Sequence, residues 1–148
     1  MAVGERGAVF VEDGLMKFVA CLWLSVIALA DAGFADVVLP PMDAKRGREL
    51  YISKGCIGCH AINQVGGEHA APLDAATMDP ELNPFEFFAR MWLGMKPMIE
   101  MQENKMGQQV DLTAQELGDL VAFIHNAELQ KSITIGEIPD NIEDLMGD

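Results

Sequence analysis

The chain has 148 residues, of which 50% are hydrophobic and 22% are charged, and its formal net charge is −13. This length favours one small domain. The acidic balance argues against nucleic-acid binding, because phosphates would be repelled by such a surface.

The first 35 residues have the pattern of an export signal behind a short leader. Met16-Lys17 gives a basic start, and a 13-residue apolar run covers Phe18 to Ala30. Small residues up to Ala35 are typical of a cleavage site. We therefore expect Met16 to be the true start and residues 1–35 to be removed, leaving a periplasmic protein. The run is shorter than the roughly 20 residues of a membrane-spanning helix, and an uncleaved anchor facing the periplasm is the alternative.

The first helix of the mature chain is expected over residues 44–54, with Asp43 as its N-cap. Gly47 and Tyr51 are four residues apart and so share one face of that helix. Gly55 should end the helix immediately before the residues that carry the chemistry.

These residues are Cys56-Ile57-Gly58-Cys59-His60, a Cys-x-x-Cys-His motif. The motif is the attachment pattern of haem c. Two thiols three positions apart can bond to the two vinyl groups of one porphyrin, and the next residue is then placed against the iron, where an imidazole can be an axial ligand. We therefore predict one covalently attached haem c, held by Cys56 and Cys59, with His60 as an iron ligand.

Two other sites are compatible with a Cys-x-x-Cys pair. A redox dithiol would leave His60 unexplained and lacks its usual setting between a strand and a helix. A zinc site would need ligands from among His60, His69 and His125, because no second cysteine pair is present.

The middle of the mature chain is expected to be a loop over residues 61–82, followed by a helix. Asn83 can cap that helix, Pro84 suits its first position, and Glu86 lies near the positive end of its dipole. The helix should continue to about Leu93 and end at Gly94.

The final helix should open at the capping box formed by Thr113 and Glu116. Its apolar residues recur at three- and four-residue spacing, and Phe123 adjoins their face; they are Leu117, Leu120, Val121 and Ile124. We divide the mature chain into a haem domain over residues 36–130 and an acidic tail over residues 131–148, which we expect to be mobile or docked on a partner.

With these features, residues 43–128 resemble the class I c-type cytochromes, small all-α proteins whose helices wrap around one covalently attached haem. The resemblance implies that Gly47 and Tyr51 cross the last helix near Phe123. It also implies that the backbone carbonyl of Pro72 accepts a hydrogen bond from the imidazole of His60, which would fix its tautomer.

The resemblance further implies a methionine as the second axial ligand. Met98 is the expected ligand, because it follows the helix stop and Pro97 in a loop; Met101 and Met95 are the alternatives. Trp92 and Arg90 are candidates to approach the haem propionates, against the alternative of an ordinary buried tryptophan.

Electron transfer in the periplasm is the expected function, because no residue set suggests a nucleophile or an acid–base pair. A haem c subunit of a larger oxidoreductase or respiratory complex is the alternative, and a gas or redox sensor would need an open axial site. Residues 36–148 contain 19 acidic and 8 basic residues, a net charge of −11. We therefore expect redox partners, a donor and an acceptor, with a basic docking surface.

Overall fold

The computed structural model describes residues 38–81 and 83–147, so the predictions on the leader, the export signal and the cleavage site lie outside the described residues. The described part of the chain forms helices and contains no β-strand, which confirms the predicted all-α fold. Its α-helices are α2 (Ala44–Ser53), α3 (Pro84–Leu93), α4 (Met95–Met106), α5 (Ala114–Ile124), α6 (Ala127–Gln130) and α7 (Asp140–Glu143). Three 3₁₀ turns join them: η1 (Cys56–Gly58), η2 (Ala75–Thr77) and η3 (Ile135–Glu137).

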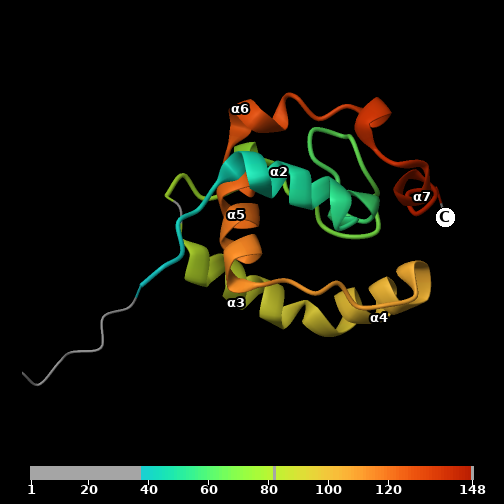
Figure 1. Cartoon of the computed structure of the whole chain (residues 1–148), viewed down its shortest axis with the longest axis horizontal. Coiled ribbons are helices and arrows are strands. Elements are labelled where there is room, and N and C mark those ends of the chain that lie inside the picture. The colour runs from blue at the N-terminus through green and yellow to red at the C-terminus, as the bar shows by residue number, and fades with distance from the viewer. Residues whose placement is uncertain (1–37, 82, 148) are drawn as a thin grey trace, which may run out of the picture. The chain divides into compact units, whose positions relative to one another are not determined.

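The crossing of α2 and α5 organises this part of the chain (Figure 1). A Cβ atom at Gly47 would lie 1.9 Å from the carbonyl oxygen of Asp119, so only glycine permits the two backbones to approach this closely. One turn along, the rings of Tyr51 and Phe123 are 5.5 Å apart between centroids and tilted by 50°. The predicted contact of Gly47 and Tyr51 with the last helix is confirmed.

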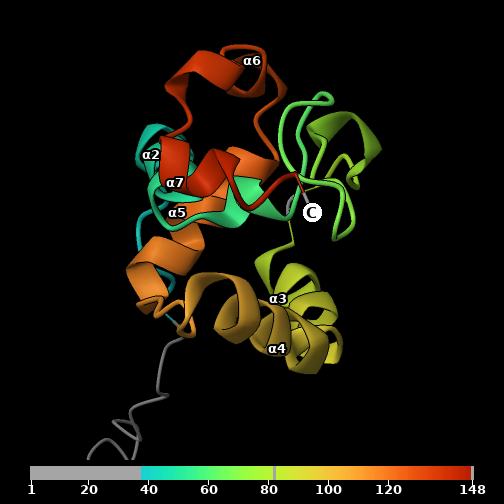
Figure 2. The same cartoon turned by 90° about the vertical axis from the view of Figure 1, so that its right-hand side faces the viewer.

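Helix α3 has the predicted bounds and cap. The side chain of Asn83 accepts hydrogen bonds from the amides of Phe85 and Glu86, and Gly94 ends the helix. Inside the domain, Phe87 packs edge-on against the ring of His125, with centroids 6.4 Å apart. Figures 1 and 2 both show α3 and α4 together on the side of the domain opposite α6.

The region after Gly94 is a helix rather than the predicted loop. Helix α4 includes Pro97 as its third residue, where a backbone N–H would have no partner within the helix in any case. The residues after Pro97 are mostly good helix formers, and Gly107, with φ +78°, supplies the left-handed end of the helix. The loop prediction was wrong because Pro97 was treated as a helix breaker.

The C-terminal segment, residues 131–147, is packed against the domain, which corrects the expectation of a mobile or partner-docked tail. Ile133, Ile138 and Ile142 are 6%, 5% and 6% exposed and belong to the main hydrophobic core. Arg48 of α2 donates to the carboxylate of Glu137 and, at 2.9 Å, to the hydroxyl of Ser132. The expectation failed because it relied on acidic composition, while three isolated isoleucines carry the packing.

Candidate haem attachment site

The Cys-x-x-Cys-His motif forms one tight turn directly after α2. Gly55 has φ +78°, a left-handed conformation that glycine adopts without strain, and it turns the chain into η1. The amides of Cys59 and His60 then donate to the carbonyl oxygen of Cys56, at 3.2 and 2.9 Å. The turn brings both thiols and the imidazole into one short stretch of backbone.

The loop after the motif fixes the backbone of this turn. Gly67 donates to the carbonyl of Ile57 at 2.9 Å, and Ala70 donates to that of Cys59 at 3.0 Å. A Cβ atom at Gly67 would lie 2.0 Å from the carbonyl oxygen of Gly58, so a larger residue would push the loop off the motif. Because these carbonyl groups already have partners, the turn has little freedom to rearrange.

Tyr51 connects the helix crossing to the motif. Its hydroxyl donates to the carbonyl oxygen of His60, and its ring is fully buried against Phe123. Burial raises the pKa of Tyr51, with smaller contributions from Cys56 and other acidic groups. The phenol therefore keeps its proton near neutral pH and remains a hydrogen-bond donor.

The imidazole of His60 is oriented by the backbone of the following loop. Its Nδ1 atom lies 2.7 Å from the carbonyl oxygen of Ala71. Since a carbonyl can only accept, Nδ1 carries the proton and Nε2 keeps a lone pair for a metal ion. This is the tautomer that an axial iron ligand requires.

The acceptor is therefore Ala71 and not Pro72, which corrects the predicted partner of His60. Pro72 acts indirectly. A proline favours an extended conformation in the residue before it, which here is Ala71. The carbonyl that the imidazole meets is the acyl half of the Ala71–Pro72 peptide bond.

The two thiols do not have the properties of a reactive dithiol. Burial raises the pKa of Cys56 to about 11. Burial also raises the pKa of Cys59, although the charge of Lys105 acts in the opposite direction. A catalytic dithiol needs a lowered thiol pKa, so this environment argues against the redox-dithiol alternative.

The histidines that a zinc site would need are engaged elsewhere. His69 donates through Nε2 to the carbonyl oxygen of Leu145 at 3.1 Å, and His125 donates through Nδ1 to that of Val121 at 2.9 Å. Within residues 38–81 and 83–147, no group of three or more His, Cys, Asp or Glu side chains could hold a metal ion. The zinc alternative therefore has no support.

Met98 lies within α4 and is partly exposed. The other end of α4 approaches the motif: a Cβ atom at Gly55 would lie 2.8 Å from the terminal methyl of Met106, and the charge of Lys105 acts on Cys59. Residues seven or eleven apart share a helical face. Met98 is thus aligned with Lys105, and Met95 with Met106, while Met101, four residues before Lys105, lies on the same face as Met98.

Trp92 is on the outer side of α3 and is 70% exposed, so the alternative of a buried tryptophan is wrong. It lines a shallow pocket together with Met95, Lys96, Ile99 and Glu100. Arg90 donates to Glu86 at 2.9 Å and to Asp79 at 3.2 Å. The structure does not bring these two residues to the motif, and their approach to the propionates stays a prediction.

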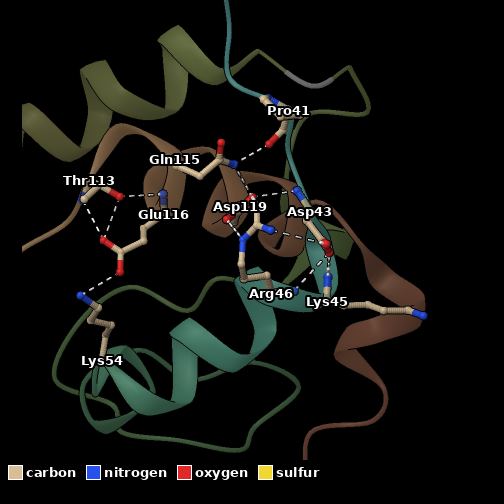
Figure 3. Close-up of polar contacts among 9 residues, drawn as sticks. All are labelled: Pro41, Asp43, Lys45, Arg46, Lys54, Thr113, Gln115, Glu116 and Asp119. Atoms are coloured by element: carbon tan, nitrogen blue, oxygen red, sulfur yellow. Dashed lines mark hydrogen bonds and ion pairs between the residues drawn. The ribbon is translucent and has the colours of Figure 1, made fainter.

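A buried carboxylate that the sequence analysis missed joins α2 to α5. Asp119 is fully buried and accepts hydrogen bonds from the Arg46 guanidinium, from the amide of Asp43 at 2.8 Å and from Gln115 at 3.0 Å (Figure 3). Gln115 also donates to the carbonyl of Pro41. The network fixes the start of α2 and hence the helix that leads into the motif. The sequence feature that could have indicated this buried carboxylate is an aspartate within an apolar helical pattern.

The donor set fits a covalently bound haem: two neutral thiols in one turn, followed by an imidazole with a free Nε2 lone pair. The family model described as Cytochrome c matches residues 44–128, more than half of the chain. No curated protein and no solved structure matches the chain. Proteins of this family are generally electron carriers that exchange electrons with redox partners. The chain therefore belongs to the cytochrome c family, carries a covalently attached haem c, and functions in haem-based electron transfer.

Proposed function

We propose that this cytochrome c is an exported carrier in the periplasm, which passes single electrons from a donor protein to an acceptor protein. The haem supplies the Fe(III)/Fe(II) couple. In this proposal His60 and Met98 are the axial ligands in both oxidation states, and Cys56 and Cys59 hold the porphyrin through thioether bonds.

One observation carries the proposal: the hydrogen bond from His60 to Ala71, in a turn whose backbone is held on both sides. An electron carrier should change its structure little when the charge on the iron changes. The fixed ring of His60 and the paired carbonyls of Ile57 and Cys59 favour such behaviour. The thioether of a methionine would favour reduced iron and raise the potential.

The surface charge supports a basic partner. The predicted mature chain, residues 36–148, has a net charge of −11. Within the C-terminal segment, Asp140, Glu143 and Asp144 are exposed. A field of this sign should increase the rate of encounter with a positively charged protein, and salt should weaken the effect.

The test combines location with charge selectivity. The full-length chain would be produced in a bacterium that attaches haem c, and the haem protein should be recovered from the periplasmic fraction with an N-terminus at residue 36. Reduced protein should react faster with hexaammineruthenium(III), a cation, than with ferricyanide after correction for driving force, and the ratio should fall as salt is added. Recovery in the cytoplasm, or a ratio independent of salt, would contradict the proposal.

A specific observation favours the second candidate, a haem c subunit of a larger complex. Trp92 and Leu93 are 70% and 84% exposed at the end of α3. Exposed apolar side chains next to each other are typical of surfaces that a partner covers. Purification from the native organism would separate the two functions: a stoichiometric partner that stays bound favours the subunit, and a free monomer favours the carrier.

No helix in the described part of the chain is long and apolar enough to cross a membrane.

A further inference from the structure

The C-terminal segment lies beyond the residues that the cytochrome c family model matches, since the match ends at residue 128. It nevertheless returns to the haem attachment motif. Figures 1 and 2 show α7 beside the turn that follows α2, although the two are far apart along the chain. The family therefore does not account for the part of the chain that covers one side of the motif.

Two glycines of the motif region meet this segment. A Cβ atom at Gly58, which is the residue before Cys59, would lie 3.1 Å from both Cβ and Cδ1 of Leu145 and 3.5 Å from the carbonyl oxygen of Ile142. A Cβ atom at Gly55, the residue before Cys56, would lie 3.3 Å from Cδ1 of Ile142. A side chain at either glycine would therefore crowd α7 or the residues just after it, so this segment packs closely over the backbone next to each cysteine.

The segment is fastened at both ends of this contact. At its start, Arg48 binds the carboxylate of Glu137 and also donates to the carbonyl of Ser132 at 3.0 Å. Near its end, His69 of the loop after the motif donates to the carbonyl of Leu145 at 3.1 Å. The same loop also holds the motif, through the amides of Gly67 and Ala70.

We propose that the C-terminal segment positions the haem attachment turn, with Ile142 and Leu145 as the positioning residues. They press on the backbone beside the two cysteines and close this side of the turn to water, while residues 66–70 hold the carbonyl groups of the motif. The inference requires the covalent haem of the family, but it does not depend on the periplasmic role or on the choice of Met98.

The expected consequence is a change in reduction potential. Ferric haem carries one more positive charge than ferrous haem, and water stabilises the more charged state. Shortening the side chain of Ile142 or Leu145 should admit water beside Cys56 and Cys59 and should permit the turn that carries His60 to move. The entry of water and the movement of the turn should each lower the potential. The entry of water should do so even in a variant whose fold is intact.

The experiment compares alanine variants of the full-length holoprotein. Ile142→Ala and Leu145→Ala remove the two positioning side chains. Ile138→Ala is the matched control for Ile142→Ala, because Ile138 is equally buried, at 5% exposed against 6%, and none of its atoms is among those nearest to a Cβ at Gly55 or Gly58. Ile135→Ala is the surface control, since Ile135 is 52% exposed. Each variant is measured for midpoint potential, for the visible spectrum of both oxidation states and for its thermal midpoint.

We expect Ile142→Ala and Leu145→Ala to lower the potential and alter the ferric spectrum, while Ile138→Ala lowers the thermal midpoint and leaves the potential unchanged. A potential that follows the thermal midpoint equally in all three variants would overturn the proposal, because the segment would then contribute general stability alone. If the alanine variants do not yield holoprotein, Ile142→Val and Leu145→Met provide smaller changes. Wild-type potentials in both of these would also overturn it.

Discussion

The Nδ1 atom of His60 lies 2.7 Å from the carbonyl oxygen of Ala71, and this contact decides which ring nitrogen is available to iron. Because Nδ1 donates its proton to this carbonyl, Nε2 on the other side of the ring keeps its lone pair. The strength of this hydrogen bond depends on the peptide bond between Ala71 and Pro72. Pro72 does not donate to or accept from the imidazole, but it should still influence the metal through Ala71.

We therefore expect Pro72→Ala to raise the reduction potential. The substitution releases Ala71 from its restricted conformation, weakens the hydrogen bond from His60, and makes the imidazole a poorer donor to the more positive ferric iron. Voltammetry of the holoprotein measures the shift. Pro80→Ala, an exposed proline before α3, is the control and should leave the potential unchanged. A potential equal to that of the wild type in Pro72→Ala would show that Ala71 is held by the rest of the loop.

The contact at Gly47 predicts a large loss of stability on the smallest substitution. Gly47→Ala places a Cβ atom within 1.9 Å of the Asp119 carbonyl oxygen and must separate α2 from α5. Overpacking of this kind costs about 1–3 kcal/mol or more. Denaturant unfolding of the holoprotein gives the difference. Gly136→Ala, whose Cβ would have no atom within 4 Å, should change the free energy of unfolding by about 0.5 kcal/mol or less. Equal effects would contradict the close crossing.

Asp119 predicts how stability depends on acid. Burial raises the pKa of its carboxyl group, but hydrogen bonds from Arg46, from the Asp43 amide and from Gln115 outweigh burial and lower the pKa overall. A carboxyl group whose pKa is lower in the folded state stabilises the fold above its unfolded pKa of 3.8 and loses this contribution as the pH falls through the folded pKa.

Asp119→Asn should therefore unfold more readily than the wild type near neutral pH, and the two curves of stability against pH should converge in acid below about pH 4. Thermal midpoints of both holoproteins across a pH series measure the convergence. Asp111→Asn, at an exposed position before α5, is the control and should follow the wild-type curve. A constant difference between Asp119→Asn and the wild type at all pH values would contradict a lowered pKa.

Much of the fold could be predicted because its signals are local. The cap at Asn83, the capping box at Thr113 and Glu116, and the Cys-x-x-Cys-His motif each lie within a few residues, and the structure forms the helices and the turn that they indicate. The acceptor for His60 was misplaced by one residue, because the sequence shows the restraining Pro72 while the carbonyl that it restrains belongs to its neighbour.

The remaining errors have a tertiary cause. Nothing within the C-terminal segment specifies a partner for Ile142, whose contact with Gly55 joins residues far apart in the chain. Helix α4 was missed because a proline is tolerated in the first turn and excluded only later. Asp119 is a polar residue in an apolar pattern, and its burial is favourable because Arg46 and the Asp43 amide at the start of the crossing helix, together with Gln115, donate to its carboxylate.

The placement of α4 leads to a prediction about the distal ligand. Met98 and Met101 both share a helical face with Lys105, whose charge reaches Cys59, whereas Met95 contributes to the outer pocket beside Trp92, and Met98 remains the proposed ligand. Met98→Ala should therefore open one axial position, lower the potential, and permit tight binding of carbon monoxide to the reduced protein, because the thioether that favours ferrous iron is gone. Met101→Ala and Met95→Ala are matched controls on the same helix and should retain the wild-type spectrum and bind carbon monoxide weakly. Spectrophotometric titration of the three reduced variants with carbon monoxide decides among the ligands. Tight binding that arises only in Met95→Ala or only in Met101→Ala would transfer the axial role to that methionine. Tight binding by the unmodified protein would favour a gas sensor instead.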